Sequence, residues 1–395
     1  MLHKNRLFTP GPTPLLPAAQ RAMASTEVHH RTAEFRALYQ KVLADLQKFI
    51  GTKNDVLLLA SSGTGAMEAS VTNLTSPGDR VLVITAGKFG ERWRELTKAF
   101  GCVVDIVDAP YGQTAPVEAI KAKLTAETRV VYVQSTESST GARHDIEGVA
   151  KLLRGSDALL VVDAITGLGT TRFDVDGWGI DVIIGGSQKA VMIPPGLAYL
   201  AVSERAWRRM DEAKQMRYYF DLKKERKNAA KGNSSFTPAT SLVAAMNAAM
   251  EHLREAGNGD LARGRDLLIE NAETAAMMTR AAAAALKLAL FSPSCPSAAL
   301  TAIVPPEGLS SDEIVKRFRE QFGAVVANGQ GEMKGQLFRI AHLGYYDYMD
   351  TIGVIAALEQ VVAQLRPGHL EFGFALRAAQ ESYARCRADA ASKKA

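Results

Sequence analysis

A lysine that follows an apolar strand pattern is the residue of this sequence best suited to covalent chemistry. The run GSQK ends at Lys189, directly after the pattern DVIIG, and the apolar run AVMIPP follows it. Burial disfavours an ammonium, so a shielded lysine has a lowered pKa and a nucleophilic amine. Schiff-base chemistry needs such an amine. The alternative at this position is a surface lysine of which only the aliphatic stem is covered.

A second candidate is Asp163, the last residue of the strand pattern ALLVVD. The carboxyl ends of parallel strands are where α/β sheets bind their ligands, so this carboxylate has a functional position. The alternative is a helix N-cap or turn aspartate.

A glycine-rich turn, SSGTGAME, follows the strand pattern DVLLLA and opens a helix pattern. The free N–H groups of a helix N-terminus, with the hydroxyls of Ser62 and Thr64, predict an anion cup. The turn lacks the lysine of a Walker A loop, which argues against an ATPase. A simple capped strand-to-helix turn is the alternative.

The glycine-rich turn, Asp163 and Lys189, in this order along the chain, are what pyridoxal 5′-phosphate (PLP) requires. The cup takes the phosphate, Lys189 bonds the aldehyde, and Asp163 keeps the pyridine nitrogen protonated. A protonated ring withdraws electrons and lowers the barrier to removal of the substrate α-proton.

The sequence resembles the class V aminotransferases of fold type I, most closely the alanine–glyoxylate and serine–glyoxylate (or serine–pyruvate) branch. The most specific matching stretch is GSQK-x₄-PPG, within GIDVIIGGSQKAVMIPPGLA (179–198). Other matching stretches extend to about residue 365: TPGPTPLLP (9–17), HHRTAEF (29–35), SSGTGAMEA (61–69), GKFGERW (87–93), ESSTG (137–141), VVDAITGLG (161–169), FTPATSL (236–242) and FRIAHLG (338–344).

The resemblance implies a role for each residue of the site. Lys189 would be the Schiff-base lysine and proton shuttle, and Asp163 the partner of the pyridinium. The other cofactor-binding residues would be Ser62, Gly63, Thr64 and Gln188 at the phosphate, Thr237 reaching the phosphate from the neighbouring subunit, Phe89 stacked on the ring, and Ser138 on the side of the ring hydroxyl. Many relatives carry Trp where Phe89 stands, so the stacking area is smaller here.

Two further residues are implied for the substrate, and no metal site is expected. Arg339 would clamp the α-carboxylate in a bidentate fork, and Gly11 would line the pocket. A surface salt bridge is the alternative for Arg339, and a core position is the alternative for Phe89. His342 is interpreted as a packed histidine, and the segment His29–Arg31 as a helix cap or part of a dimer interface.

Alternating strand and helix patterns from 21 to 260 predict an α/β fold with a mostly parallel, doubly wound sheet. The expected strands are 55–60, 80–84, 103–107, 129–134, 158–163, 181–184 and 197–202, and the expected helices include 62–73, 91–100, 117–124 and 149–154. Four prolines predict an extended N-terminal arm over residues 1–20. A smaller α+β C-terminal domain is expected over 261–368, followed by a helical tail over 369–395.

Composition indicates a globular chain and excludes a disordered or fibrous one. The 395 residues are 47% hydrophobic and 23% charged, with a net charge of +5. This bias is too weak to indicate a nucleic-acid binder, and the basic run 205–231 is interpreted as a solvated face. No stretch fits a membrane span or a secretory signal. Three separated cysteines, without metal-ligand spacing, favour a reducing compartment, so a cytoplasmic location is expected.

The expected function is PLP-dependent transamination by a ping-pong mechanism through Lys189, in a homodimer with shared active sites. Alanine or serine is the expected donor, and glyoxylate or pyruvate the expected acceptor, because the sequence offers no second arginine for a side-chain carboxylate. An aspartate-specific member of the family is an alternative. Another is a cysteine desulfurase, which needs a mobile cysteine in a loop of the small domain; the glycine-rich candidate loop Val326–Glu332 has none. A catalytically inactive scaffold with the same fold is the third.

Overall fold

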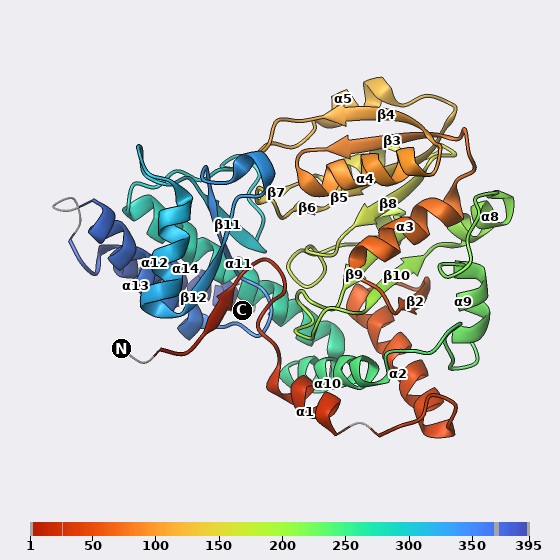
Figure 1. The fold of residues 1–395 in the computed structure, drawn as a ribbon, viewed down its shortest axis with the longest axis horizontal. Helices are drawn as coiled ribbons and strands as arrows, with labels where there is room; N and C mark the ends of the chain where they lie inside the picture. The colour runs from red at the N-terminus through yellow and green to blue at the C-terminus, as the bar shows by residue number, and fades with distance from the viewer. Residues whose placement is uncertain (1–2, 26, 367–370, 393–395) are drawn as a thin grey trace.

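Two β-sheets organise the computed structural model, which describes residues 3–25, 27–366 and 371–392 (Figure 1). The larger sheet has seven strands in the order β2-β10-β9-β8-β5-β3-β4. Its strands are β2 (Asp55–Leu59), β3 (Arg80–Thr85), β4 (Val103–Asp108), β5 (Thr128–Gln134), β8 (Leu159–Asp163), β9 (Val182–Gly186) and β10 (Ala198–Val202). Only β10 runs antiparallel to its neighbours in this sheet. The mostly parallel α/β sheet expected from the sequence is therefore confirmed.

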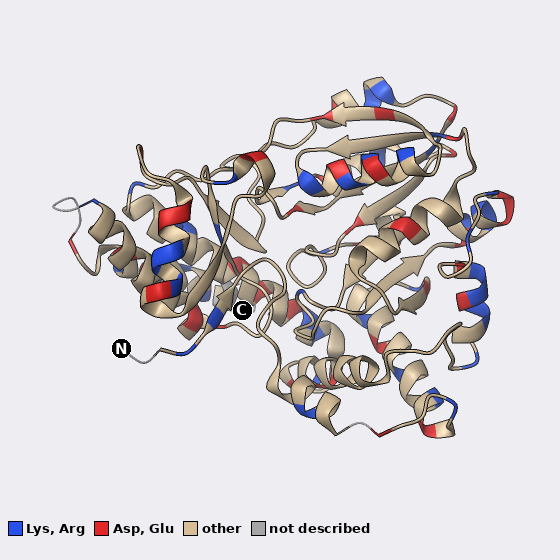
Figure 2. Cartoon of the chain, viewed as in Figure 1, with Lys and Arg blue, Asp and Glu red and all other residues tan. Residues whose placement is uncertain are grey.

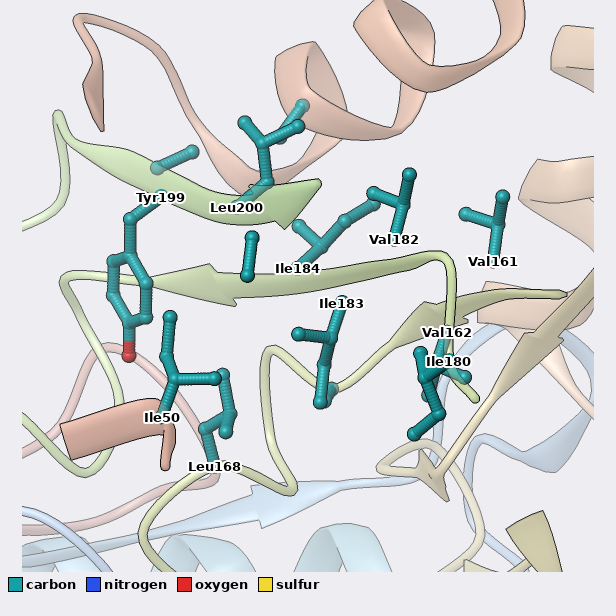
Figure 3. Close-up of a cluster of buried hydrophobic side chains, with 14 of the residues drawn as sticks. Ile50, Val161, Val162, Leu168, Ile180, Val182, Ile183, Ile184, Tyr199 and Leu200 are labelled. Carbon is teal, nitrogen blue, oxygen red and sulfur yellow. The ribbon is translucent and has the colours of Figure 1, made fainter. Parts of the chain in front are cut away.

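The central strands are apolar on both faces because helices cover them on both sides. The side chains of Val161, Val182, Ile183 and Leu200 are each at most 1% exposed. Figure 3 shows Val182 and Ile183 projecting to opposite sides of β9. This burial makes the sheet a rigid support, so the loops at its strand ends are held in fixed positions.

The helices between the strands follow the expected pattern. They are α2 (Ala33–Ile50), α3 (Gly63–Leu74), α4 (Lys88–Ala99), α5 (Val117–Lys123), α6 (Ile146–Leu152), α7 (Val175–Trp178), α8 (Glu204–Glu212), α9 (Leu222–Ala229) and α10 (Thr240–Ala256). A short hairpin, β6 (Thr136–Glu137) and β7 (Ala142–Arg143), follows β5. Thr32 caps α2 by accepting a hydrogen bond from the N–H of Phe35 at 3.3 Å. The preceding histidines are therefore not needed as caps.

The smaller sheet has the order β1-β12-β13-β11 and its own apolar core. Its strands are β1 (Arg6–Phe8), β11 (Leu300–Ile303), β12 (Ala324–Asn328) and β13 (Phe338–Ala341). Around it lie α11 (Leu261–Ala285), α12 (Ser311–Phe322), α13 (Tyr348–Leu365) and α14 (Phe374–Ser392), with a 3₁₀ turn at Gly331–Met333. The strand β12 includes Val326–Asn328, so the sequence interpretation of 326–332 as one glycine-rich loop is wrong for its first three residues.

The N-terminal segment differs from the extended arm expected over residues 1–20. It supplies β1, which pairs in parallel with β12, and then helix α1 (Pro17–Ala24), which has Pro17 in its first turn. Proline is tolerated there because the first N–H groups of a helix have no intrahelical partner. Between them, Thr13 donates its hydroxyl hydrogen to the Lys189 carbonyl at 2.9 Å. The segment thus packs against other parts of the same subunit and connects the small sheet to the loop that carries Lys189.

The basic run 205–231 occupies α8, α9 and the loops around them at the edge of the molecule (Figure 2). Several of its cations pair with nearby acids, as in Arg209 with Asp79 at 2.6 Å and Arg226 with Asp55 at 2.7 Å. No helix in the described part of the chain is long and apolar enough to cross a membrane. The expected boundary at 368–369 lies outside the described residues.

Candidate active site

The predicted chemical residues converge at the carboxyl ends of three strands. Ser62 to Thr64 follow β2, Asp163 ends β8, and Gln188 and Lys189 follow β9. They line one cavity of about 290 Å³. The predicted residues that line this cavity are Gly11, Ser62, Gly63, Thr64, Phe89, Asp163, Gln188 and Lys189.

Lys189 is a buried amine, with 8% of the residue exposed. Burial lowers the pKa of Lys189 to about 8, against the opposing effect of the Asp163 charge, while Arg339 and Arg92 lower it further. The amine donates a hydrogen bond to the Pro10 carbonyl. About a tenth of the amine is therefore in the neutral, nucleophilic form at pH 7, far more than for an unshifted lysine, and Schiff-base chemistry uses this form.

Asp163 faces the same cavity and is 5% exposed. Burial raises the pKa of its carboxyl to about 6, while the Ile165 N–H and the charges of Lys189 and Arg92 act in the opposite direction. The Ile165 N–H donates to its Oδ1 at 2.9 Å. A buried carboxylate of this kind is stabilised by a cation brought next to it, which is what the pyridinium of PLP provides.

The phosphate cup is open at the start of α3. Ser62 is the N-cap residue of this helix, yet its side chain makes no capping hydrogen bond. A Cβ at Gly63 would lie 2.3 Å from Cδ1 of Ile165, so only glycine fits without movement. The amide oxygen of Gln188 is buried without a hydrogen-bond partner among the described residues. The free N–H groups of a helix N-terminus fit a bound anion, to which Gln188 would donate through its amide nitrogen.

Arg92 is a residue of the cavity that the sequence analysis missed. It lies on α4 three residues after Phe89, and its guanidinium carbon is 4.8 Å from the centre of the Phe89 ring. Its Nη1 donates to Oγ1 of Thr64 at 3.1 Å, which orients that hydroxyl in the cup. The signal was present in GKFGER, because residues three apart share one face of a helix.

Glu137 is a second missed residue, and it anchors the helix that carries Phe89. Its carboxylate is 0% exposed and accepts hydrogen bonds from the N–H groups of Phe89 at 3.0 Å and Gly90 at 3.1 Å. The other oxygen accepts from the N–H of Ser139 at 3.2 Å and from its hydroxyl. Glu137 therefore fixes the start of α4 and the turn after β6 relative to each other.

Arg339 and Ser138 contact each other but do not line the cavity. Nη1 of Arg339 donates to the Ser138 carbonyl at 2.6 Å, and Nη2 donates to the carbonyl of Asn328. Burial lowers the pKa of Arg339 to about 10. Its Nε has no partner, and no carboxylate pairs with it among residues 3–25, 27–366 and 371–392. The buried Glu137 carboxylate acts on Arg339 through its charge without forming an ion pair, so a substrate carboxylate fits as the direct partner of this buried cation.

Two other predicted residues lie away from the cavity. Thr237 borders a separate hollow with Tyr219 and Phe236, so a contact with phosphate in its own subunit is not seen. His342 is fully buried, with its Nε2 2.8 Å from the hydroxyl of Thr301. Burial lowers the pKa of His342 to about 3, so its ring is neutral and packed.

Comparison with known proteins places this geometry in a family. The family model described as "Aminotransferase class-V" matches residues 18–330. A Synechococcus protein named "Soluble hydrogenase, small subunit" is 38% identical over 92% of this chain and 94% of its own. An L-aspartate–glyoxylate aminotransferase of Paracoccus denitrificans is 33% identical over the full length of both chains. A serine–glyoxylate aminotransferase of Methylorubrum extorquens is 31% identical over 90% of each.

Solved structures agree with this assignment. An aspartate aminotransferase of Thermus thermophilus is 34% identical and has a TM-score of 0.84, over 91% of this chain and 99% of its own. An alanine–glyoxylate aminotransferase of a Nostoc species is 27% identical with a TM-score of 0.84, over 92% and 96%. The chain therefore belongs to the class-V aminotransferases, which makes it a PLP-dependent transaminase.

Proposed function

We propose that this transaminase moves the amino group of alanine or serine to glyoxylate or pyruvate in two half-reactions. The observation that carries the proposal is the pair formed by Lys189 and Asp163 in one buried cavity, with the amine pKa lowered to about 8. An amine with this pKa can both take up and return a proton near neutral pH.

Each residue has a defined task in this proposal. PLP, when bound, withdraws electrons from the substrate Cα. Lys189 then takes the proton from Cα in the first half-reaction and delivers a proton to Cα in the second. Asp163 holds the proton of the ring nitrogen, and Phe89 covers one face of the ring. Arg339 binds the α-carboxylate, which orients the Cα–H bond toward Lys189.

A small neutral donor is supported by the restricted space next to the amine. A Cβ at Gly11 would lie only 2.7 Å from Nζ of Lys189, so the chain closely approaches the reacting position. Arg339 is already bound to two carbonyls and has one free nitrogen, which suits a single carboxylate. The serine–glyoxylate and alanine–glyoxylate relatives also favour this donor class.

Aspartate is the second candidate donor, and Arg92 is the observation that favours it. This arginine borders the cavity and has no carboxylate partner among the described residues, so it could receive a side-chain carboxylate. The Paracoccus and Thermus relatives act on aspartate according to their names.

Steady-state rates with alanine, serine, aspartate and glutamate, each against glyoxylate and pyruvate, distinguish the two candidates. The proposal expects a higher kcat/KM for alanine or serine than for aspartate. A higher kcat/KM for aspartate than for alanine and serine overturns it. A colourless, inactive protein after addition of PLP would instead support an inactive scaffold.

A homodimer in the cytoplasm completes the proposal. Phe236, the residue before Thr237, contacts Tyr218 and Tyr219, which are 77% and 49% exposed, and such aromatic side chains suit an interface. Thr237 of the partner subunit would then reach the phosphate. The three cysteines are free thiols, which supports a reducing compartment. Sedimentation that shows a fully active monomer would contradict the shared site.

A further inference from the structure

A second cavity, of about 700 Å³, lies between α11 and the segment that joins β5 to α6. None of the residues predicted to bind cofactor or substrate lines it. Ser135 borders this second cavity, whereas the next residue, Thr136, borders the cavity of Lys189. Consecutive residues of one segment therefore line the two cavities.

The charge left unpaired on the wall of the second cavity is positive in sum. Glu273 pairs with Arg172 at 2.7 Å, whereas Asp145 caps α6 and has no cationic partner among the described residues. Glu147 is paired with a lysine one turn along α6. Arg280 on α11 and Arg143 on β7 have no carboxylate partner in the part of the chain that the structure describes.

Buried polar groups of the same wall also lack partners. Ser135 is 1% exposed, and its hydroxyl makes no hydrogen bond within the described ranges. His144 is 5% exposed, and its ring interacts with the Gln134 backbone but with no side chain. Arg280 donates from one nitrogen to the Ser297 carbonyl, yet its Nε is buried and free. Native structures pair almost all such groups, so this set indicates a bound ligand.

We propose that the second cavity binds a small oxyanion, a phosphate or a dicarboxylate, between Arg143 and Arg280. Two guanidinium groups supply charge and forked donors for its oxygens, and the hydroxyl of Ser135 adds a neutral donor. The ring of His144 borders the same space. This ring is neutral because burial lowers the pKa of His144 to about 4. The anion would join helix α11 to the separate β6–β7 hairpin.

The second cavity also contacts the active site through two residues. Arg280 holds the carbonyl of Ser297, and the hydroxyl of Ser297 lies 3.3 Å from that of Thr136. Thr136 is part of the wall around Lys189. An anion at Arg280 is thus positioned to affect the active-site wall, and catalytic rates measured with and without the anion report this effect.

Calorimetric titration of the holoenzyme with inorganic phosphate, and separately with malonate, tests the site at an ionic strength held constant with KCl. PLP fills the phosphate cup during both titrations. Malonate is titrated into Arg339→Gln as well, which removes the proposed substrate clamp. The expectation is one binding event for at least one probe, weakened about tenfold or more by Arg280→Gln.

Two further variants make the result decisive. Arg143→Gln removes the exposed arginine, so it tests the site even if Arg280→Gln unfolds the protein. Arg317→Gln removes a surface cation outside the cavity and serves as the charge-matched control. Binding that is lost in the cavity variants and kept in the control supports the site, and the preferred probe identifies the anion class. Absence of binding to the wild type, or equal binding to all variants, overturns the proposal.

Discussion

Gly11 lies directly against Lys189: a Cβ at Gly11 would come within 2.7 Å of Nζ and 2.9 Å of Cε. The preceding residue, Pro10, accepts a hydrogen bond from the same amine. The N-terminal segment, 179 residues away in sequence, therefore forms one wall of the catalytic cavity. Its β1 strand also belongs to the small sheet, so that sheet and the lysine loop are joined through this contact.

Gly11→Ala should lower cofactor occupancy and activity, because the added methyl group occupies the position of the amine. Gly155→Ala is the matched control. Both glycines have positive φ values, 145° and 78°, but a Cβ at Gly155 meets nothing within 4 Å. Each variant should lose about 1–2 kcal/mol of unfolding free energy from backbone strain. Only Gly11→Ala should lose PLP absorbance, and equal absorbance in both variants would refute the steric role.

The rate at which the cofactor-free protein takes up PLP should rise with pH and level off above about 8. Burial lowers the pKa of Lys189 to about 8, so the neutral amine is the major form only above that pH. Uptake at pH 6 should be about 50-fold slower than at pH 8, from the fraction of neutral amine. Stopped-flow absorbance measures this rate. A rate that keeps rising tenfold per pH unit up to pH 10 would indicate an exposed, unperturbed lysine.

Asp163→Asn should reduce kcat strongly while the protein still folds. Loss of one partner from a buried charge pair costs about 3–5 kcal/mol, which corresponds to about 10²–10⁴-fold in rate. Asp174→Asn, at an exposed helix N-cap, is the control and should retain full activity. A rate within a few-fold of the wild type in Asp163→Asn would rule out the pyridinium partnership.

PLP affinity of the wild type should fall as the pH decreases below about 6. Burial raises the pKa of the Asp163 carboxyl to about 6. At lower pH this carboxyl is protonated in the cofactor-free protein, and it must lose its proton before it can pair with the pyridinium of PLP. The same raised pKa favours the cofactor-free fold at acidic pH, and this stabilisation is lost as the pH rises through 6. Titrations from pH 5 to 8 should show this dependence in the wild type and not in Asp163→Asn.

Glu137→Gln should displace the start of α4 and with it the Phe89 ring. The glutamine amide keeps one oxygen acceptor but places an NH₂ donor against backbone N–H groups. This mismatch should lower the free energy of unfolding by about 1–3 kcal/mol. The expected result is a lower unfolding midpoint together with a shifted PLP absorption band and a raised KM for PLP. Glu118→Gln, on the exposed side of α5, is the control. A lower midpoint without any change at the cofactor would limit Glu137 to a structural role.

The strands that carry the site could be predicted because their apolar runs are local features of the sequence. The DVIIG and ALLVVD patterns predict β9 and β8, and their order places Lys189 and Asp163 at one edge of the sheet. The pairing of β1 with β12 could not be predicted, since it depends on contacts between distant segments. The same holds for Glu137, whose acceptor role toward the N–H groups of Phe89 and Gly90 appears only when β6 and α4 are brought together.

The most direct test of the account is to locate the lysine that holds PLP. The holoenzyme is treated with borohydride, which reduces the bond between cofactor and lysine, and is then digested and examined by mass spectrometry. The account predicts the added mass on the peptide that contains Lys189 and its absence in Lys189→Ala. Modification of another lysine, such as Lys88 near Phe89, with Lys189 unmodified, would contradict the central role of the buried amine.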